Sequence, residues 1–316
     1  MSTIRAAVIA VWIVIFIGGC SSSSKTSTEQ LQKETIAEQQ KNDRTAAMQL
    51  FIDGSLKESK GQFAEAILDY QDALRYDKDP AIYYALAKNY AGLKRYVASI
   101  ENALEAIKLD SSKIDYRELL GQIYIHSGQF DKAAQIYRSI LTIDPRHVNS
   151  LFALAQILER SRPLESLQMY ERILRHQGPS WEILLQVAQL NTVLQRYPQA
   201  TEAYEQMLKL DPSNIAVKQN LADMYMRQKQ YDKAISTVND VLEKNPKNLF
   251  LRATLVDVYL QQNEWASARK EMETILASDS LDPDLHFRIG IAFYSQTLKD
   301  SSLYNDAISI FKKFEK

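Results

Sequence analysis

The feature of this 316-residue chain that most constrains its fold is a period of about 34 residues. Aromatic residues recur in one register, with a single double-length gap: Phe63, Tyr96, Phe130, Tyr197, Tyr231 and Trp265. A small residue lies three positions after each aromatic residue, and after Pro163 in the gap: Ala66, Ser99, Ala133, Ser166, Ala200, Ala234 and Ala268. Units this short cannot bury an apolar face alone, so the period predicts an array of stacked repeats.

Within each period the apolar residues have helical spacing. In the third period, Leu120, Gly121 and Tyr124 are followed by Ala133 and Tyr137, and no strand-like alternation appears. The whole chain has 9 glycines and 8 prolines, which are few for a fold that needs many tight turns. Each unit is therefore predicted to be helix A, a short turn, helix B and an exit, marked by Pro145, Pro212 or Pro246 in three units.

This pattern resembles the tetratricopeptide repeat, in which Leu-Gly-x2-Tyr precedes Ala-x3-aromatic and a proline. The third period matches it from Leu120 to Pro145. The resemblance implies an all-α fold, an α-solenoid of about eight antiparallel helix-turn-helix repeats wound into a right-handed superhelix. The repeats would span residues 46–316, with the first and last degenerate. The fourth is one residue short, and the eighth has about five extra residues around Gln296–Tyr304.

The N-terminus has the features of a targeting segment. Arg5 precedes an unbroken apolar run from Ala6 to Ile17, which is too short to cross a bilayer. The run leads to Ile17-Gly18-Gly19-Cys20, and Cys20 is the single cysteine of the chain. This segment is similar to the signal peptide of a bacterial lipoprotein. The similarity implies cleavage after residue 19 and acylation (palmitate among the chains) of Cys20. An idle cysteine after an ordinary signal peptide is the alternative.

Residues 20–45 are predicted to connect the lipid to the repeats. Residues 21–28 are Ser- and Thr-rich and predict a flexible linker. Residues 29–44 are Gln-rich, with few apolar positions, and are compatible with either a marginal helix or disorder. In both cases this segment would act as a stalk. Because Ser21 rather than Asp follows the cysteine, the expected destination is the periplasmic side of the outer membrane, with the inner membrane less favoured.

The sequence offers no catalytic constellation and predicts no enzyme and no cofactor. Phosphate-binding, zinc-protease and nucleophile-elbow motifs are absent from it. Its four histidines are scattered, which predicts no metal site: His126, His147, His176 and His286. A formal net charge of −1 gives no basic footprint for nucleic acid.

Partner binding is expected on the A helices, which the resemblance places along a concave groove. The fifth and ninth positions of a repeat often contact ligand in this family. We call these the groove positions. The predicted binding residues occupy them: Tyr84, Lys88, Gln122, Phe152, Gln156, Gln189, Gln219, Asp223 and Asp257. Consecutive ninth-position glutamines could pair with the backbone of an extended peptide, whereas a merely solvated polar face is the alternative.

These observations favour a membrane-anchored scaffold or assembly factor that binds other envelope proteins or peptides. The rival interpretation is a regulatory or helper subunit of an envelope polysaccharide or secretion enzyme complex. Apolar residues near the end of the chain also predict self-association at the C-terminal end: Ile308, Ile310, Phe311 and Phe314.

Overall fold

A computed structural model describes residues 21–277 and 283–314, and over these residues the chain contains α-helices, one short 3-10 helix and no strand. The chain divides into two compact units, residues 1–143 and 144–316. The all-helical prediction is confirmed.

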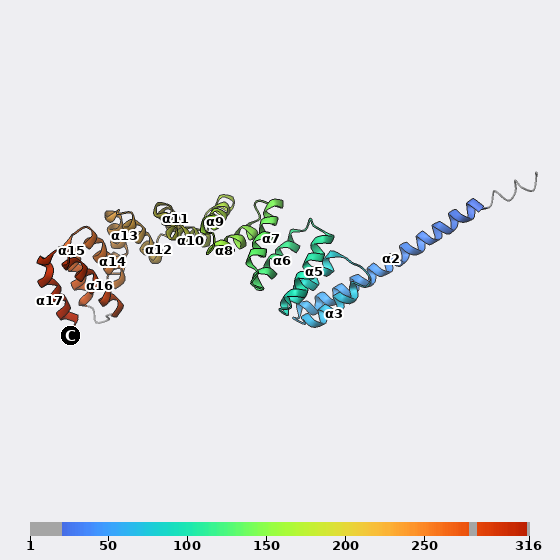
Figure 1. Cartoon of the computed structure of the whole chain (residues 1–316), viewed down its shortest axis with the longest axis horizontal. Helices are drawn as coiled ribbons and strands as arrows, with labels where there is room; N and C mark the ends of the chain where they lie inside the picture. The colour runs from blue at the N-terminus through green and yellow to red at the C-terminus, as the bar shows by residue number, and fades with distance from the viewer. Residues whose placement is uncertain (1–20, 278–282, 315–316) are drawn as a thin grey trace, which may run out of the picture. The chain divides into compact units, whose positions relative to one another are not determined.

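The first unit contains three helix pairs (Figure 1). Its helices are α2 (Ser21–Ser59), α3 (Phe63–Ala73), α4 (Pro80–Gly92), α5 (Tyr96–Leu109), α6 (Ile114–His126) and α7 (Phe130–Ile143). In each pair an even-numbered helix A packs on the odd-numbered helix B that follows it.

The second unit continues the alternation with five pairs. Its helices are α8 (Val148–Leu158), α9 (Pro163–Gln177), α10 (Trp181–Val193), α11 (Tyr197–Leu210), α12 (Ile215–Arg227), α13 (Tyr231–Lys244), α14 (Leu249–Gln261), α15 (Trp265–Leu276), α16 (Pro283–Thr297) and α17 (Tyr304–Phe314). The extra residues of the eighth repeat form the 3-10 helix η1 (Ser301–Leu303) between α16 and α17. Eight helix pairs thus lie within the described ranges, as the period predicts.

Small residues let the two helices of a pair approach closely. A Cβ atom built on Gly121 would lie 2.7 Å from Cζ of Tyr137, and one on Gly54 would lie 2.8 Å from Cε1 of Tyr70. Real Cβ atoms do not tolerate such distances, so each glycine makes room for the tyrosine ring of its partner helix. In this way helix A and helix B of one repeat form a single packed unit.

Serine replaces alanine at the small position of helix B in two repeats, where it is fully buried. Ser99 Oγ donates to the carbonyl oxygen of Ala87 at 2.6 Å, and Ser166 Oγ donates to that of Ala155 at 2.8 Å. Both hydroxyls therefore satisfy their hydrogen-bonding capacity against helix A, which removes the cost of burying them.

The turn from helix A to helix B has one repeated conformation. Where it occurs, three residues lie between the two helices. The first still donates a hydrogen bond to helix A, and the second has a left-handed backbone conformation. Positive φ angles of 57° to 75° occur two residues before helix B at Gly61, Lys94, Gly128, Gln195, Lys229 and Asn263. The N–H of the residue after the left-handed one donates to the carbonyl oxygen five residues earlier, as from Arg95 N to the Tyr90 oxygen at 2.8 Å. This is a Schellman helix end. The fourth repeat, one residue shorter, has no left-handed residue here.

Short polar side chains begin several A helices. Asp79 accepts from the Ala81 N–H at 2.7 Å, with Pro80 in the first helical turn. Asn214 and Asn248 each accept from the N–H three residues later at 3.1 Å. These caps satisfy N–H groups that a helix start leaves open, and so they fix where each A helix begins.

Helix α2 differs from the predicted linker. It runs without interruption from Ser21 to Ser59, so residues 21–28 lie in its first turns and residues 29–44 are helical. Its side chains become buried from Ala47 onward, where α3 packs on it. Gln, Lys and Glu are good helix formers and the packed C-terminal part supplies a nucleus, which favours helix over coil in the polar part. The signal segment and Cys20 lie outside the described residues.

Of the C-terminal apolar residues, the structure describes one side chain, that of Ile308. Ile308 is partly exposed on α17. The structure does not describe the side chains of Ile310, Phe311 and Phe314. Self-association at this end therefore stays a prediction.

Candidate functional site

All nine predicted binding residues lie on A helices, distributed over both units. The first unit holds Tyr84, Lys88 and Gln122, and the second unit holds the other six. Lys88 and the three ninth-position glutamines are exposed. The remaining five are half-buried: Tyr84, Phe152, Gln219, Asp223 and Asp257. Their exposure leaves side-chain atoms of every position accessible to a ligand.

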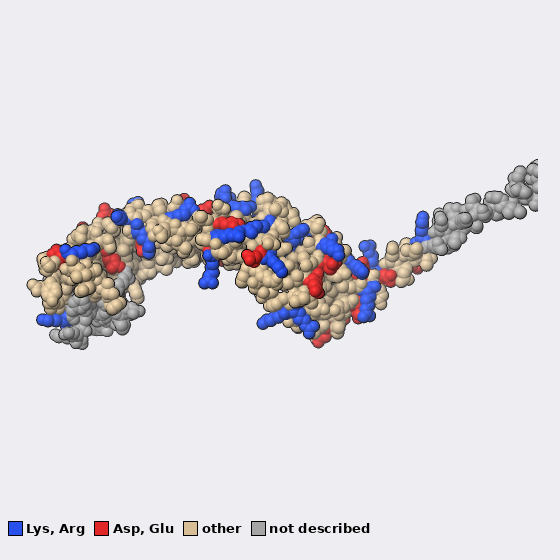
Figure 2. Space-filling view, in the orientation of Figure 1, with Lys and Arg blue, Asp and Glu red and all other residues tan. Residues whose placement is uncertain are grey.

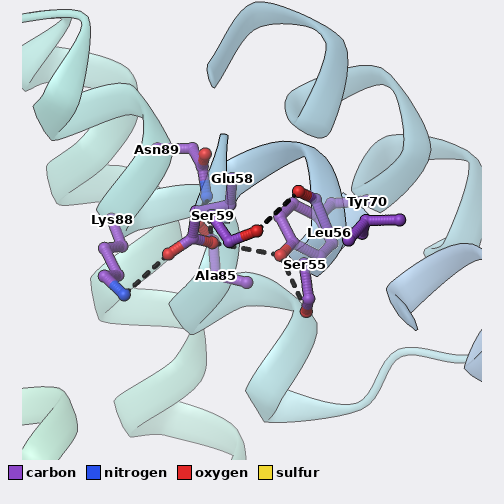
Figure 3. Close-up of polar contacts among 8 residues, drawn as sticks. All are labelled: Ser55, Leu56, Glu58, Ser59, Tyr70, Ala85, Lys88 and Asn89. Atoms are coloured by element: carbon purple, nitrogen blue, oxygen red, sulfur yellow. Dashed lines mark hydrogen bonds and ion pairs between the residues drawn. The ribbon is translucent and has the colours of Figure 1, made fainter. Parts of the chain in front are cut away.

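Lys88 is held by a carboxylate from the preceding repeat. Its Nζ lies 2.6 Å from Oε1 of Glu58, near the end of α2 (Figure 3). The other oxygen of Glu58 accepts from Asn89 Nδ2 at 2.7 Å and from the Tyr70 hydroxyl at 3.1 Å. Helices α2, α3 and α4 thus meet in one polar network, which fixes the position of the cation at the groove.

The network decides the charge state of its members. Burial alone would raise the pKa of Glu58, but hydrogen bonds from Lys88 and Asn89, together with the charge of Lys88, hold it below its ordinary value. The hydrogen bond to Glu58 raises the pKa of Lys88 against the effect of burial. Burial, with Glu58 nearby, raises the pKa of Tyr70 to about 12. Lys88 therefore stays cationic and Glu58 anionic at neutral pH.

Tyr84 stacks on an aromatic ring of the next repeat. Its ring centroid lies 5.2 Å from that of Tyr116 on α6, at an interplanar angle of 37°. Burial raises the pKa of both hydroxyls, so both tyrosines are neutral donors at physiological pH. Because Tyr116 is buried, Tyr84 alone of this pair presents part of its side chain to a ligand, one helical turn before Lys88.

A cavity of about 330 Å³ opens beside the same helices, between α2 and the start of α4. Apolar side chains form most of its lining and charged side chains the remainder: Ala47, Met48, Phe51, Ala81 and Ile82 with Arg44, Asp77 and Asp79. Arg44 Nε lies 3.5 Å from Asp77 Oδ2. A cavity of this lining suits one apolar side chain of a bound peptide.

In the second unit the two glutamines Gln156 and Gln189 lie on α8 and α10, in consecutive repeats, and both are exposed. Phe152, one turn before Gln156, contacts Tyr170 of its own helix pair edge to face, with ring centroids 5.9 Å apart. Its ring is thus partly used for packing. It offers an edge rather than a whole face to a ligand.

Acidic groove positions follow on α12 and α14. Asp223 pairs with Arg227 at 2.8 Å, and the Arg227 guanidinium lies 5.5 Å above the ring centre of Tyr197. Asp257 on α14 also has a polar partner, and Gln219 is half-buried. Both side chains of the Asp223–Arg227 pair are about half exposed, so a ligand cation could replace Arg227 at Asp223.

The described residues contain no group of three or more His, Cys, Asp or Glu that could hold a metal ion. Within the same residues, no helix combines the length and apolarity needed to span a membrane. Figure 2 shows basic and acidic side chains interspersed over the face in view. This mixture provides no broad field of one sign there.

Sequence reasoning missed the partners that orient the groove residues. Asn89 is fully buried, next to Lys88, and its role depends on Glu58, which lies 31 residues earlier. Tyr116 likewise reaches Tyr84 from another repeat. The only sequence signal was Asn89 itself, a polar residue at a position that is apolar in the other A helices, such as Ile123 and Leu190.

Comparisons with known proteins agree with the repeat geometry. Two family models, both described as tetratricopeptide repeat, match residues 84–148, and 193–250 with 239–286. A DnaJ homolog subfamily C member 7 homolog of Dictyostelium discoideum is 29% identical over 160 residues, which cover 45% of this chain and 30% of that protein. A small glutamine-rich tetratricopeptide repeat-containing protein of the same organism is 39% identical over 66 residues, covering 21% and 20%. The chain thus spans less than a third of either relative.

A solved structure shows the same fold. The C-terminal part of a TPR repeat-containing protein from Cytophaga hutchinsonii superposes with a TM-score of 0.54, at 17% identity, covering 75% of this chain and 98% of that one. Tetratricopeptide-repeat proteins are generally protein–protein interaction scaffolds, and the fold is typically non-catalytic. The matched segments, the eight helix pairs and this superposition together identify the chain as an array of tetratricopeptide repeats.

Proposed function

We propose that this chain is a lipid-anchored scaffold or assembly factor that binds other proteins or peptides of a bacterial envelope through the groove positions of its A helices. The observation that carries the proposal is the exposure of polar groove residues on successive repeats, above all Gln122, Gln156 and Gln189. Amide groups can donate to and accept from the backbone of an extended peptide without reading its sequence.

Other side chains would add orientation and anchoring. Lys88, held in place by Glu58, would attract a carboxylate of the ligand, and Asp223 and Asp257 would attract cations. The apolar cavity between α2 and α4 would take one large aliphatic or aromatic side chain. On each unit, features of this kind suit a polypeptide segment rather than a small metabolite.

The membrane anchor and the location are part of the same proposal. Cys20, with the residues before it, supports a lipoprotein on the periplasmic side of the outer membrane, and two or more acyl chains hold a protein stably on a bilayer. The alternative partner is an enzyme complex of envelope polysaccharide synthesis or secretion, which this chain would serve as a helper subunit.

The deciding experiment is a pull-down with the detergent-solubilised chain. Replacing Gln122, Gln156 and Gln189 with Glu keeps the side-chain size but removes the amide donors and adds negative charge. We expect loss of the captured partners, identified by mass spectrometry. The matched control replaces three exposed glutamines on B helices of the same three repeats, Gln135, Gln168 and Gln199, and should capture normally. Equal recovery of partners by both triple variants would disprove partner binding through the three groove-position glutamines.

A further inference from the structure

The exposed face of α16 carries a longer apolar row than that of any other A helix in the described residues; the next longest, on α2, has three members, Met48, Ile52 and Leu56. Three large apolar side chains of α16, and Leu298 directly after its last residue, follow one another in steps of four, three and four residues, and are 71%, 52%, 60% and 71% exposed in chain order: Phe287, Ile291, Tyr294 and Leu298. We call this row the α16 seam. Soluble proteins rarely expose a continuous apolar row, and such rows usually mark an interaction surface.

The seam is specific to the eighth repeat. Ile291 is a ninth-position residue, and the ninth position is polar in the seven other repeats: Ser55, Lys88, Gln122, Gln156, Gln189, Asp223 and Asp257. Leu298 follows seven residues later, where the others have Gln, Arg or Glu, apart from Pro163 in the shortened fourth repeat. General packing of the repeat therefore does not require these apolar residues.

The opposite face of α16 is firmly packed, which fixes the direction of the seam. Ile289 and Phe293 are buried in a core shared with α14 and α15, and the Phe293 ring contacts Trp265 edge to face at 5.9 Å between centroids. Rotating α16 to bury the seam would expose this core. The seam must therefore be covered by something outside its own repeat.

We infer that the α16 seam is a self-association surface on which two copies of this chain pair their α16 helices in antiparallel fashion. The steps of four, three and four residues are those of a coiled-coil seam. About a twofold axis between Ile291 and Tyr294, each ring meets an aliphatic chain: Phe287 lies opposite Leu298, and Tyr294 opposite Ile291. One identical surface thus supplies both halves of the contact.

Charge also favours a second copy over an unlike partner. Residues 289–297 contain no Asp, Glu, Lys or Arg, in a chain with 24% charged residues. Two copies can therefore approach without like-charge repulsion along the seam. The same stretch gives a charged partner nothing to pair with, so the occupant is itself an uncharged apolar helix face. Phe287 and Ile291 are groove positions of the eighth repeat, but they are not among the binding residues proposed above, and the glutamine substitutions of the pull-down leave the seam unchanged.

Sedimentation equilibrium of the full chain in density-matched detergent tests the inference. We expect reversible dimers, and at least a tenfold weaker association for Ile291→Glu. The control is Ile143→Glu, because Ile143 at the end of α7 is 49% exposed outside any such row and the substitution is identical. Unchanged far-UV circular dichroism verifies that both variants are folded. A monomer at every concentration, or equal association of Ile291→Glu and the unsubstituted chain, would overturn the inference.

Disulfide trapping tests the antiparallel register in a Cys20→Ser background. A mixture of Ile291→Cys and Tyr294→Cys chains should form the mixed disulfide in preference to either homodimer, because these two positions face each other. An Ile143→Cys chain supplies the background rate of random oxidation. Cross-linking no faster than this background, or a preference for homodimers of either variant, would contradict the pairing.

Discussion

At the residue scale, the array depends on pairs of side chains whose sizes are matched across each helix pair. Gly121 faces Tyr137, and Gly54 faces Tyr70, whereas Ala222 shares a core cluster with the smaller Val238 in the sixth repeat. The sequence pattern predicted small residues at these places. It could not predict which pair is tightest, because that depends on the approach of two helices from different parts of the period.

Gly121→Ala should destabilise the first unit by about 1–3 kcal/mol through overpacking, since the new methyl group meets the Tyr137 ring. The urea midpoint followed by circular dichroism measures this loss. Combining it with Tyr137→Val, which imitates the Ala222 and Val238 pair, should cost less than the sum of the two single losses. Additive losses would show that the ring does not restrict this position.

Glu58 should make the first unit sensitive to acid. Its folded-state pKa lies below the ordinary value of 4.5, so its stabilising contribution is complete above that value and disappears as the pH falls through the folded pKa. Urea midpoints between pH 7 and pH 3 should fall less steeply for Glu58→Gln. Glu105→Gln, which breaks an exposed pair with Lys108, is the control and should leave the slope unchanged.

At the element scale, the repeated helix end is the clearest feature that the sequence only partly revealed. A turn was expected at Gly128, because glycine is typical of turns that need a left-handed residue. The same left-handed conformation is adopted by Lys94, Gln195, Lys229 and Asn263, none of which is a glycine. Stacking of the repeats imposes the conformation there at the expense of local backbone energy, so residue preference alone could not identify it.

Lys229→Gly should therefore raise stability by about 1 kcal/mol, because glycine accepts a φ of 58° without strain. The urea midpoint of the second unit measures the gain. Lys270→Gly, at an exposed position in the middle of α15, is the matched control and should lower the midpoint, because glycine weakens a helix interior. A loss from both substitutions would argue against strain at position 229.

At the scale of the whole molecule, the fold was predictable and the function of its surface was not. Eight helix pairs follow from the 34-residue period, because apolar spacing and small residues are local signals. The groove residues were assigned by position, and their exposure is compatible with binding. However, the ion pair of Lys88 with Glu58 and the apolar seam of α16 depend on contacts and exposures that one repeat cannot reveal.

Cys20→Ala should abolish incorporation of labelled palmitate and release the chain from membranes on carbonate washing, because the apolar run before it is too short to act as a span. Metabolic labelling and fractionation of whole cells measure both effects. Ser22→Ala, two residues later, is the control and should keep label and membrane retention. Label that persists in the Cys20→Ala chain would rule out acylation at this cysteine.

The length of helix α2 sets the distance between Cys20 and the first repeat. Its 39 residues begin immediately after Cys20, and Arg44 already pairs with Asp77 of the first repeat. At 1.5 Å per residue, the part before Arg44 measures about 35 Å. An acyl group on Cys20 would therefore hold the first repeat at a set standoff from the bilayer, comparable to the thickness of the bilayer itself. The repeats could then bind partners that extend this far from the bilayer, whereas partners that lie flat on the lipid surface would not reach them.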